Sequence, residues 1–133
     1  PEFGVPDRLA RLLKNQNYGR YATDQGELPV CFIHNTDITG GNSGSPVING
    51  SGELVGLAFD GNWEAMSGDI FFENKVQRTI SVDIRYVLFV IDKFAQADRL
   101  LKEMDLVTTA GTHDEGTTIP ENARRQEAEP AEE

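Results

Sequence analysis

Cysteine and histidine are scarce in this chain of 133 residues, which holds one cysteine and two histidines. The single cysteine, Cys31, excludes an internal disulfide framework. It lies in the apolar run LPVCFI, where we expect a buried thiol that packs as a small hydrophobe. His34 and His113 leave few candidates for an imidazole base. Since no spacing typical of metal ligands occurs, we expect neither a metal nor another cofactor.

Long hydrophobic runs and excess positive charge are missing as well. The best candidate for a membrane span, YVLFVI at residues 86–91, is far shorter than the ~20 apolar residues that a bilayer requires. The chain has 22 acidic and 12 basic residues and a formal net charge of −10. This balance argues against nucleic acid or an anionic membrane as a partner. A hydrophobic share of 38% fits one small domain or a part of a larger one.

Composition divides the chain into three stretches. Residues 108–133 contain seven acidic residues, two arginines and, apart from alanine, a single aliphatic residue. They cannot bury enough surface to offset chain entropy, so we expect an acidic, disordered tail. Residues 1–4 include PEF, which we interpret as a cloning scar or a linker. Residues 5–107 are expected to form the folded segment.

The order of the predicted elements indicates strands between two helical regions. We expect a short helix in DRLARLLKNQNYGRY with Asp7 as its N-cap and Gly19 as its stop. Strands are predicted for ELPVCFIHN and VQRTISV, and PVING with ELVGLAFD reads as a hairpin. From Asp83 onward, apolar residues follow a helical period on one face, which predicts a C-terminal helix capped by Asp83: Ile84, Val87, Leu88, Ile91, Phe94, Leu101 and Met104.

Four strands are too few to close a barrel alone. The expected fold class is therefore mainly β with a C-terminal helix, forming part of a larger antiparallel barrel domain.

The loop DITGGNSGS suits the presentation of a serine nucleophile. Such a serine must stand clear of its backbone, with amide protons aimed at the developing oxyanion. Gly41 and Gly44 permit backbone conformations that a Cβ atom disfavours. The pattern predicts Ser43 as the nucleophile and the amides of Gly41 and Ser43 as the oxyanion hole. A glycine- and serine-rich turn without chemistry is the alternative interpretation.

The strand that follows the loop adds further candidate residues. ELVGLAFDG ends 16 to 18 residues after Ser43, and an antiparallel return would bring its end beside the nucleophile. We therefore expect Phe59, Asp60 and Gly61 to border the site. The edge of this strand can pair with an extended peptide substrate.

The residues TDITGGNSGSPVINGSGELVGLAFDGNWEAMSGDI closely resemble the bacterial dipeptidyl-peptidase family of chymotrypsin-clan serine exopeptidases. The later stretch QRTISVDIRYVLFVIDKFAQADRLLKEM and the earlier YGRYATDQGELPVCF are similar to the same family. GNSGSP is shared with glutamyl endopeptidases, whereas FDGNWEAMSGD is specific. The resemblance covers residues 5–107.

This resemblance implies a segment of a longer enzyme. Family members have a double β-barrel catalytic domain and a helical domain that caps the cleft, and are usually dimers in the bacterial periplasm or at the cell surface. They release dipeptides from peptides with a free N-terminus. The chain would be the C-terminal part of such a peptidase and would contribute to its second barrel. Its partners would be peptide substrates and the N-terminal part of the parent.

The motif match also assigns roles to individual residues. It makes Ser43 the nucleophile, and it places Asp60 where the family has a carboxylate that binds the substrate's α-ammonium group. Gly61 stands where the branch that prefers Asp or Glu at P1 has an arginine, in FDRNWEA. The resemblance therefore implies a hydrophobic or broad P1 preference. Asn42 replaces the aspartate of GDSGGP proteases, so it cannot pair with a new N-terminal ammonium during zymogen activation.

The family's catalytic histidine and aspartate lie in the N-terminal part of its members. His34, nine residues before Ser43, does not match the family's catalytic position, and we expect it to be a strand or surface imidazole. The isolated chain is therefore expected to be inactive, because a serine without a base is a weak nucleophile. Two alternatives stay open: a segment of a glutamyl-endopeptidase-like serine protease, and a non-catalytic interaction module.

Overall fold

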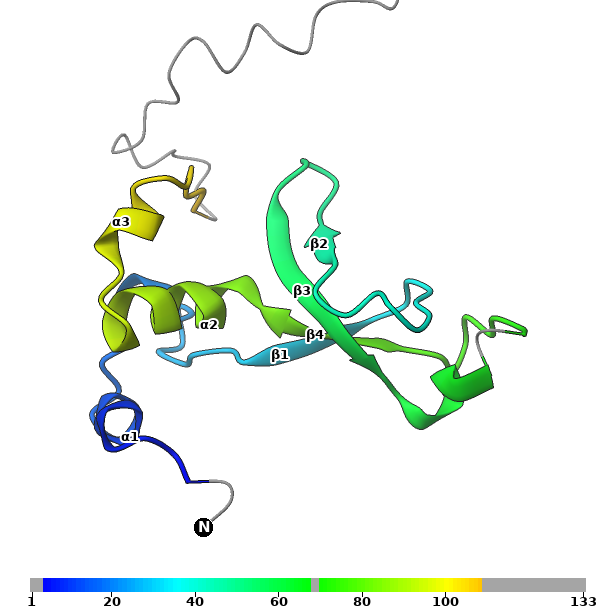
Figure 1. Ribbon diagram of the computed structural model, residues 1–133, viewed down its shortest axis with the longest axis horizontal. Helices are drawn as coiled ribbons and strands as arrows, with labels where there is room; N and C mark the ends of the chain where they lie inside the picture. Colours follow the sequence, from blue (N-terminus) through cyan, green and yellow to red (C-terminus); the bar gives the residue numbers. More distant parts are fainter. Residues whose placement is uncertain (1–3, 68–69, 109–133) are drawn as a thin grey trace, which may run out of the picture. The chain divides into compact units, whose positions relative to one another are not determined.

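The computed structural model describes residues 4–67 and 70–108, and the chain divides into two units, Pro1–Gln96 and Ala97–Glu133. The elements of the first unit follow one another along the chain, as Figure 1 shows: α1 (Asp7–Lys14), η1 (Gly19–Tyr21), β1 (Cys31–His34), β2 (Pro46–Ile48), β3 (Leu54–Gly61), η2 (Trp63–Ser67), β4 (Thr79–Asp83), α2 (Ile84–Phe89) and η3 (Val90–Phe94). The second unit contains α3 (Asp98–Leu101).

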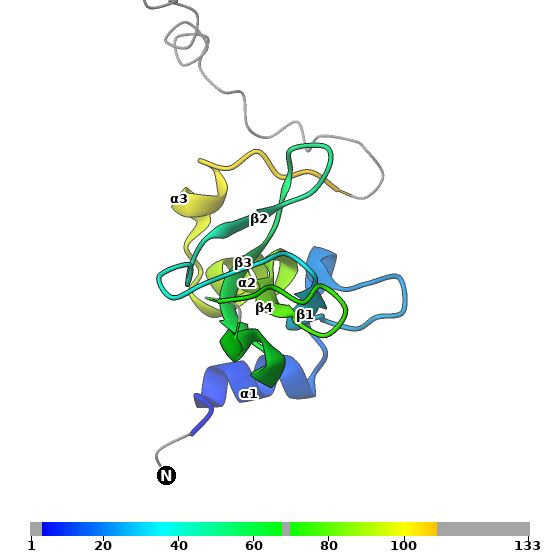
Figure 2. The ribbon, with the colours of Figure 1, turned by 90° about the vertical axis from the view of Figure 1, so that its right-hand side faces the viewer.

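The four strands form one antiparallel sheet in the order β1-β4-β3-β2, which Figures 1 and 2 show from two sides. β3 is the longest strand, and its pairing with β4 runs from Gly56 opposite Asp83 to Gly61 opposite Thr79. A Cβ atom on Gly56 would lie 2.6 Å from Phe32 Cε1, so only glycine lets this aromatic ring lie across β3. The predicted antiparallel strands and the hairpin of β2 and β3 are confirmed.

Few apolar side chains are buried in the described residues. The buried hydrophobic residues are Tyr21, Ala58 and Phe89. Phe89 lies against Tyr18 and Tyr86, with ring centroids 6.0 and 6.2 Å apart. The Tyr21 hydroxyl donates a 2.9 Å hydrogen bond to Asp92, and burial raises the pKa of this phenol. This small aromatic cluster connects the segment around η1 to the helix that follows β4.

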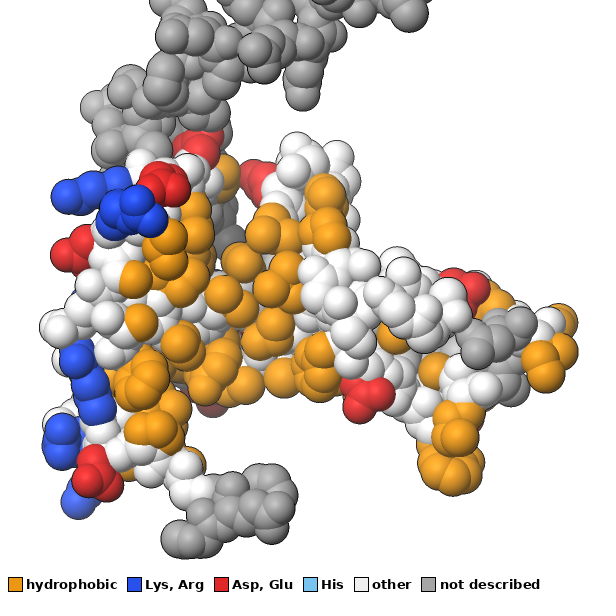
Figure 3. All heavy atoms as spheres, in the orientation of Figure 1, with side chains coloured by type: hydrophobic (Ala, Val, Ile, Leu, Met, Phe, Trp, Pro, Cys, Tyr) orange, Lys and Arg blue, Asp and Glu red, His pale blue; other side chains and the backbone are white. Residues whose placement is uncertain are grey.

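Many large hydrophobic side chains are exposed, several of them on the strands of the sheet, and Figure 3 shows hydrophobic side chains gathered on one face of the molecule. Isolated exposed hydrophobic residues are ordinary, but contiguous patches usually mark an interaction surface. The exposed set is Val5, Val30, Ile33, Ile48, Leu54, Phe59, Trp63, Met66, Ile70, Phe71, Val76, Leu100 and Val107.

Cys31 belongs to the exposed residues, so the prediction of a buried thiol is wrong. Exposure alternates along β1, and Cys31 shares the outward face with Ile33. Successive side chains of a strand point to opposite faces of the sheet. Because only one face of this sheet is covered, the apolar run LPVCFI cannot be buried on both sides.

The helices differ from the predictions at their ends. Pro6, and not Asp7, occupies the N-cap of α1, and Asp7 lies in the first turn. The single helix expected from Asp83 to Met104 is also wrong. α2 passes into the π-helical turn η3, and Gln96 then adopts φ 53°, a left-handed conformation that ends the helix. The predicted cap at Asp83 is confirmed, because its side chain accepts a hydrogen bond from the amide of Arg85.

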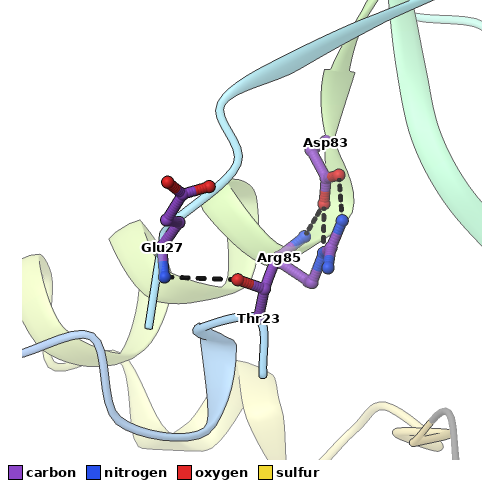
Figure 4. A network of polar contacts seen from close by, with 4 residues as sticks. All are labelled: Thr23, Glu27, Asp83 and Arg85. Carbon is purple, nitrogen blue, oxygen red and sulfur yellow. Dashed lines mark hydrogen bonds and ion pairs between the residues drawn. The ribbon is translucent and has the colours of Figure 1, made fainter. Parts of the chain in front are cut away.

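Asp83 joins the sheet to α2 through a dense set of polar contacts, shown in Figure 4. Its carboxylate is almost buried and accepts from the Arg85 amide and Nε at 2.9 Å, and from an Arg85 terminal nitrogen at 2.8 Å. The Thr23 hydroxyl, drawn in the same view, accepts a 3.2 Å bond from the amide of Glu27 and closes the turn before β1. Loss of the Asp83 carboxylate would leave the first turn of α2 uncapped.

We therefore expect Asp83→Ala to lower the free energy of unfolding by about 2 kcal/mol, since a cap and a partly buried ion pair are lost together. Asp83→Asn keeps an oxygen acceptor for the cap and loses the charge, so its effect should be smaller. Urea unfolding followed by circular dichroism measures both. An Asp83→Ala chain as stable as the unchanged chain would contradict the assignment.

Candidate active site

The loop of residues 35–45 connects β1 to β2 and carries Ser43. Its turn is held by Asn42, whose Oδ1 accepts a 2.8 Å bond from the Thr39 amide while its own amide donates to the Thr39 carbonyl at 3.1 Å. The Asn42 carbonyl accepts from the Ser45 amide at 2.9 Å. Asn42 therefore organises the loop, a role that its comparison with GDSGGP did not reveal. An asparagine within a glycine-rich loop is the sequence signal for such a turn.

The glycines on either side of Ser43 are required by backbone conformation. Gly41 has φ 98° and Gly44 has φ 89°, both in the left-handed region that other residues rarely adopt. A Cβ atom at either position would meet no described atom within 4 Å, so space is not the constraint. Within residues 4–67 and 70–108, the amides of Gly41 and Ser43 donate no hydrogen bond. Both amides are thus available to an incoming acceptor.

Ser43 is exposed and lies against the far end of β3. Its hydroxyl donates a long hydrogen bond, 3.5 Å, to the carbonyl oxygen of Phe59. The neighbouring backbone fixes this approach, because the Gly44 amide donates to the Ala58 carbonyl at 2.7 Å and the Ala58 amide donates to Ser45 at 2.9 Å. Ser43 and Phe59, which the sequence predicts to border the same site, are therefore in contact.

A β-bulge at Phe59 shapes the next part of the strand. Pairing with β4 passes from Ala58 opposite Ser81 to Asp60 opposite Ile80, so Phe59 is an extra residue. Bulges redirect side chains at strand ends. Both Phe59 and Asp60 are exposed here. The Asp60 carboxylate accepts a 2.8 Å bond from the Gly61 amide, and in the described part of the chain it forms no ion pair.

Gly61 lies against the short helix η2. A Cβ atom at this position would be 2.8 Å from Cβ of Ala65, 3.7 Å from the Arg78 carbonyl oxygen and 3.9 Å from Ile38 Cδ1. Any side chain at residue 61 therefore requires η2 to move. Gly61 itself contributes neither a side chain nor a cation to the site.

His34 does not contact Ser43 in the structure. Its Nε2 lies 2.7 Å from the Ser81 hydroxyl, and its Nδ1 lies 2.8 Å from the Thr36 hydroxyl. Burial lowers its pKa, which favours the neutral imidazole at pH 7. Both ring nitrogens have partners, and the contact with Ser81 joins β1 to β4, which agrees with the expected strand imidazole. The second histidine, His113, lies outside the described residues.

Neither a metal centre nor a membrane span is found in the part of the chain that the structure describes. No three of its histidine, cysteine, aspartate and glutamate side chains come close enough together to hold a metal ion. None of its helices combines the length and the apolar character needed to traverse a bilayer.

The site thus combines a serine on a glycine-rich turn, two available amides and an unpaired carboxylate on the adjacent strand, features suited to peptide-bond hydrolysis. Comparison with known proteins agrees with this class: the sequence profile of the Peptidase S46 family matches residues 1–106. The chain belongs to the peptidase S46 family.

Relatives in this family are similar over the same region. The dipeptidyl-peptidase 7 of Phocaeicola vulgatus is 60% identical over 107 residues, which cover 80% of this chain and 15% of that protein. The Asp/Glu-specific dipeptidyl-peptidase of Porphyromonas gingivalis is 53% identical over 106 residues, with the same two coverages. The chain therefore spans about one seventh of the length of these curated relatives.

A solved structure agrees in fold as well as in sequence. The crystal structure of Porphyromonas endodontalis DPP11 in complex with substrate superposes with a TM-score of 0.72 at 53% identity. The match covers 75% of this chain and 15% of that one. The antiparallel sheet with its few helices is thus a partial match to a much larger peptidase.

From this geometry we expect Ser43 of the chain to resist a fluorophosphonate probe, because its hydroxyl contacts a carbonyl oxygen and no imidazole. The measurement is covalent labelling of the folded chain, checked by circular dichroism, with Ser43→Ala as the matched control. Labelling that vanishes in Ser43→Ala would contradict the expectation. It would show that a base is present, and His34→Gln would then test the imidazole.

Proposed function

We propose that this chain is the nucleophile-bearing segment of a serine dipeptidyl peptidase, which releases dipeptides from the free N-terminus of peptides. The observation that carries the proposal is the contact between Ser43 and Phe59, since it joins the serine to the strand that bears Asp60. The names of the relatives, dipeptidyl-peptidase 7 and Asp/Glu-specific dipeptidyl-peptidase, support the same reaction.

In the proposed reaction the Ser43 oxygen attacks the carbonyl carbon of the second substrate residue and transfers its proton to a base. The amides of Gly41 and Ser43 stabilise the negative oxygen of the tetrahedral intermediate. The leaving amine takes the proton as the peptide bond breaks, and water then hydrolyses the acyl-enzyme. The Asp60 carboxylate pairs with the α-ammonium group, so a blocked N-terminus is disfavoured.

The base is supplied in this proposal by the remainder of the parent polypeptide, which also carries the triad aspartate. The isolated chain is then inactive. The sheet forms part of the second barrel of a chymotrypsin-like double-barrel domain. Support comes from the exposed hydrophobic side chains of the sheet, such as Ile33, Ile48 and Leu54, and from the outer edges of β1 and β2, which such a barrel would cover. A homodimeric parent in the periplasm or at the cell surface completes the proposal and rests on resemblance alone.

We further propose that the enzyme prefers hydrophobic or varied residues at P1. Gly61 offers no cation to an acidic side chain, and η2 fills the space beside it. The dipeptidyl-peptidase 7 and the Asp/Glu-specific dipeptidyl-peptidase each share more than half of the aligned residues with this chain, so overall similarity does not decide the P1 preference.

The first test uses the full-length peptidase that carries this segment. It should release dipeptides from a peptide with a free N-terminus and fail on the N-acetylated peptide. Asp60→Asn should lower kcat/KM for the free peptide by about ten- to a hundred-fold, because a charge-assisted bond is lost.

Ser43→Ala is the control that should abolish cleavage. Equal cleavage of free and acetylated peptides would support the endopeptidase alternative, and a full-length protein that cleaves neither would support the non-catalytic one.

The second test concerns P1. In the full-length peptidase, Gly61→Arg should raise the ratio of kcat/KM for glutamate over leucine at P1 by at least about ten-fold, because it adds a cation. Gly61→Ala is the matched control, since it adds the Cβ atom beside Ala65 without the charge. An unchanged enzyme that already favours glutamate over leucine would contradict the proposed preference.

A further inference from the structure

Asn62 follows Gly61 directly and extends the pairing of β3 with β4 by one residue. Its amide donates to the Arg78 carbonyl at 2.9 Å. The Arg78 amide donates in return to the Asn62 side-chain oxygen at 2.8 Å. A side-chain carbonyl thus takes the place that a backbone carbonyl occupies within the strand. Asn62 thus ends the strand with a side-chain acceptor for the Arg78 amide.

The amide nitrogen of the same side chain joins the two arms that follow the strand, residues 62–67 and 70–77. Asn62 Nδ2 donates to the Val76 carbonyl at 2.8 Å and to the Glu64 carboxylate at 2.7 Å. One side chain therefore makes three short hydrogen bonds to three residues. Three bonds on one small amide fix its orientation and leave little freedom to the backbone that carries it.

Gln77 supplies a second, buried connection between the same arms. Only 2% of its surface is exposed. Its Nε2 donates to the carbonyl oxygens of Glu64 and Phe71, both at 3.1 Å, and its Oε1 accepts from the Glu73 amide at 3.0 Å. The base of this segment is therefore anchored from two sides, and Asn62 is the anchor nearest to Asp60.

Asp60 and Gly61 lie between the β-bulge at Phe59, which loosens the backbone, and the contacts of Asn62, which fix it. The bulge at Phe59 interrupts the ladder on one side and releases the strand from regular pairing. The Asn62 contacts restore a fixed backbone on the other side. Without them, a short exposed stretch beside the nucleophile would be held only by its pairing with Ile80 and Thr79.

We infer that Asn62 is a positioning residue for the α-ammonium site: its amide clamp holds Asp60 at the place where the free N-terminus binds. The inference rests on the proposed function, in which Asp60 is the partner of that ammonium group. Asn62 acts through Asp60 and touches neither the substrate nor Ser43.

The experiment is a double-mutant cycle in the full-length peptidase with an N-terminally free dipeptidyl substrate. Asn62→Ala should raise KM about ten-fold with kcat changed less than about two-fold, because misplacement of a binding group acts on substrate affinity. In the Asp60→Ala background, Asn62→Ala should leave KM nearly unchanged, since residues that act as a unit are not additive.

Asn49 provides the matched control. Its side chain clamps the β2–β3 hairpin with as many bonds, because Oδ1 accepts from the amides of Ser51 and Glu53 at 3.0 Å and Nδ2 donates to the Glu53 carboxylate at 2.6 Å. It lies at the opposite end of β3 from Asp60. Asn49→Ala should therefore leave KM unchanged, and an equal rise in KM would overturn the inference by showing a general effect of losing a clamp.

Two results separate the inference from the function on which it rests. If Asp60→Ala raises KM and Asn62→Ala raises it further by an independent factor, the positioning role is overturned while the proposed function stands. If Asp60→Ala leaves KM unchanged, the ammonium site itself fails and the inference falls with it.

A second pair of variants tests the clamp if Asn62→Ala does not fold. Asn62→Asp keeps the acceptor for the Arg78 amide but sets a carboxylate against that of Glu64, so KM should rise. Adding Glu64→Gln returns a donor to this pair but not the bond to the Val76 carbonyl, so KM should fall part of the way toward that of the unchanged enzyme. A KM in the double variant that is no lower than in Asn62→Asp would overturn the inference.

Discussion

The antiparallel pairing of β3 with β4 is the constraint on which the rest of the site depends. β4 supplies the buried polar residues Thr79, Ser81 and Asp83, and each connects a different part of the molecule. Thr79 donates to the Thr36 carbonyl ahead of the nucleophile loop, Ser81 meets His34 on β1, and Asp83 caps α2. β3 carries the substrate side of the site along the same ladder. A shift of this register by one residue would exchange the two faces and separate all of these contacts.

In the proposed function, this segment contributes electrostatic and geometric effects, and proton transfer falls to another part of the parent enzyme. Ser43, two available amides and a carboxylate are arranged within one hairpin and its flanking loop. Such preorganised groups stabilise charge without moving during the reaction. Under that proposal, a short segment of a long peptidase would contain much of the recognition and would still need a histidine from elsewhere.

Local patterns predicted the sheet, the hairpin, the cap at Asp83 and the loop that brings Ser43 to Phe59. Turn chemistry and alternation along a strand are short-range properties, so they can be read without knowledge of the whole fold. The break at Gln96 could not be foreseen, because a left-handed residue within a helical pattern leaves no compositional trace. The exposure of Cys31 was missed for another reason: burial depends on neighbours beyond the strand. The role of Asn62 depends on a contact with Arg78, 16 positions away, and the residue type alone does not indicate it.

Ser43, just before β2, and Asp60, near the end of β3, lie at the open end of one hairpin, and this bears on the length of the product that an exopeptidase releases. In the proposed reaction, product length equals the distance between the hydroxyl that cuts and the carboxylate that holds the chain end. Two extended residues span roughly 7 Å, so an error of half that distance would change the product. Because one hairpin joins the loop that carries Ser43 to the strand that carries Asp60, the distance between the two groups is set within a short stretch of chain. Opening and closing of a cleft elsewhere in a large enzyme would admit or release peptides without altering the length of the piece removed.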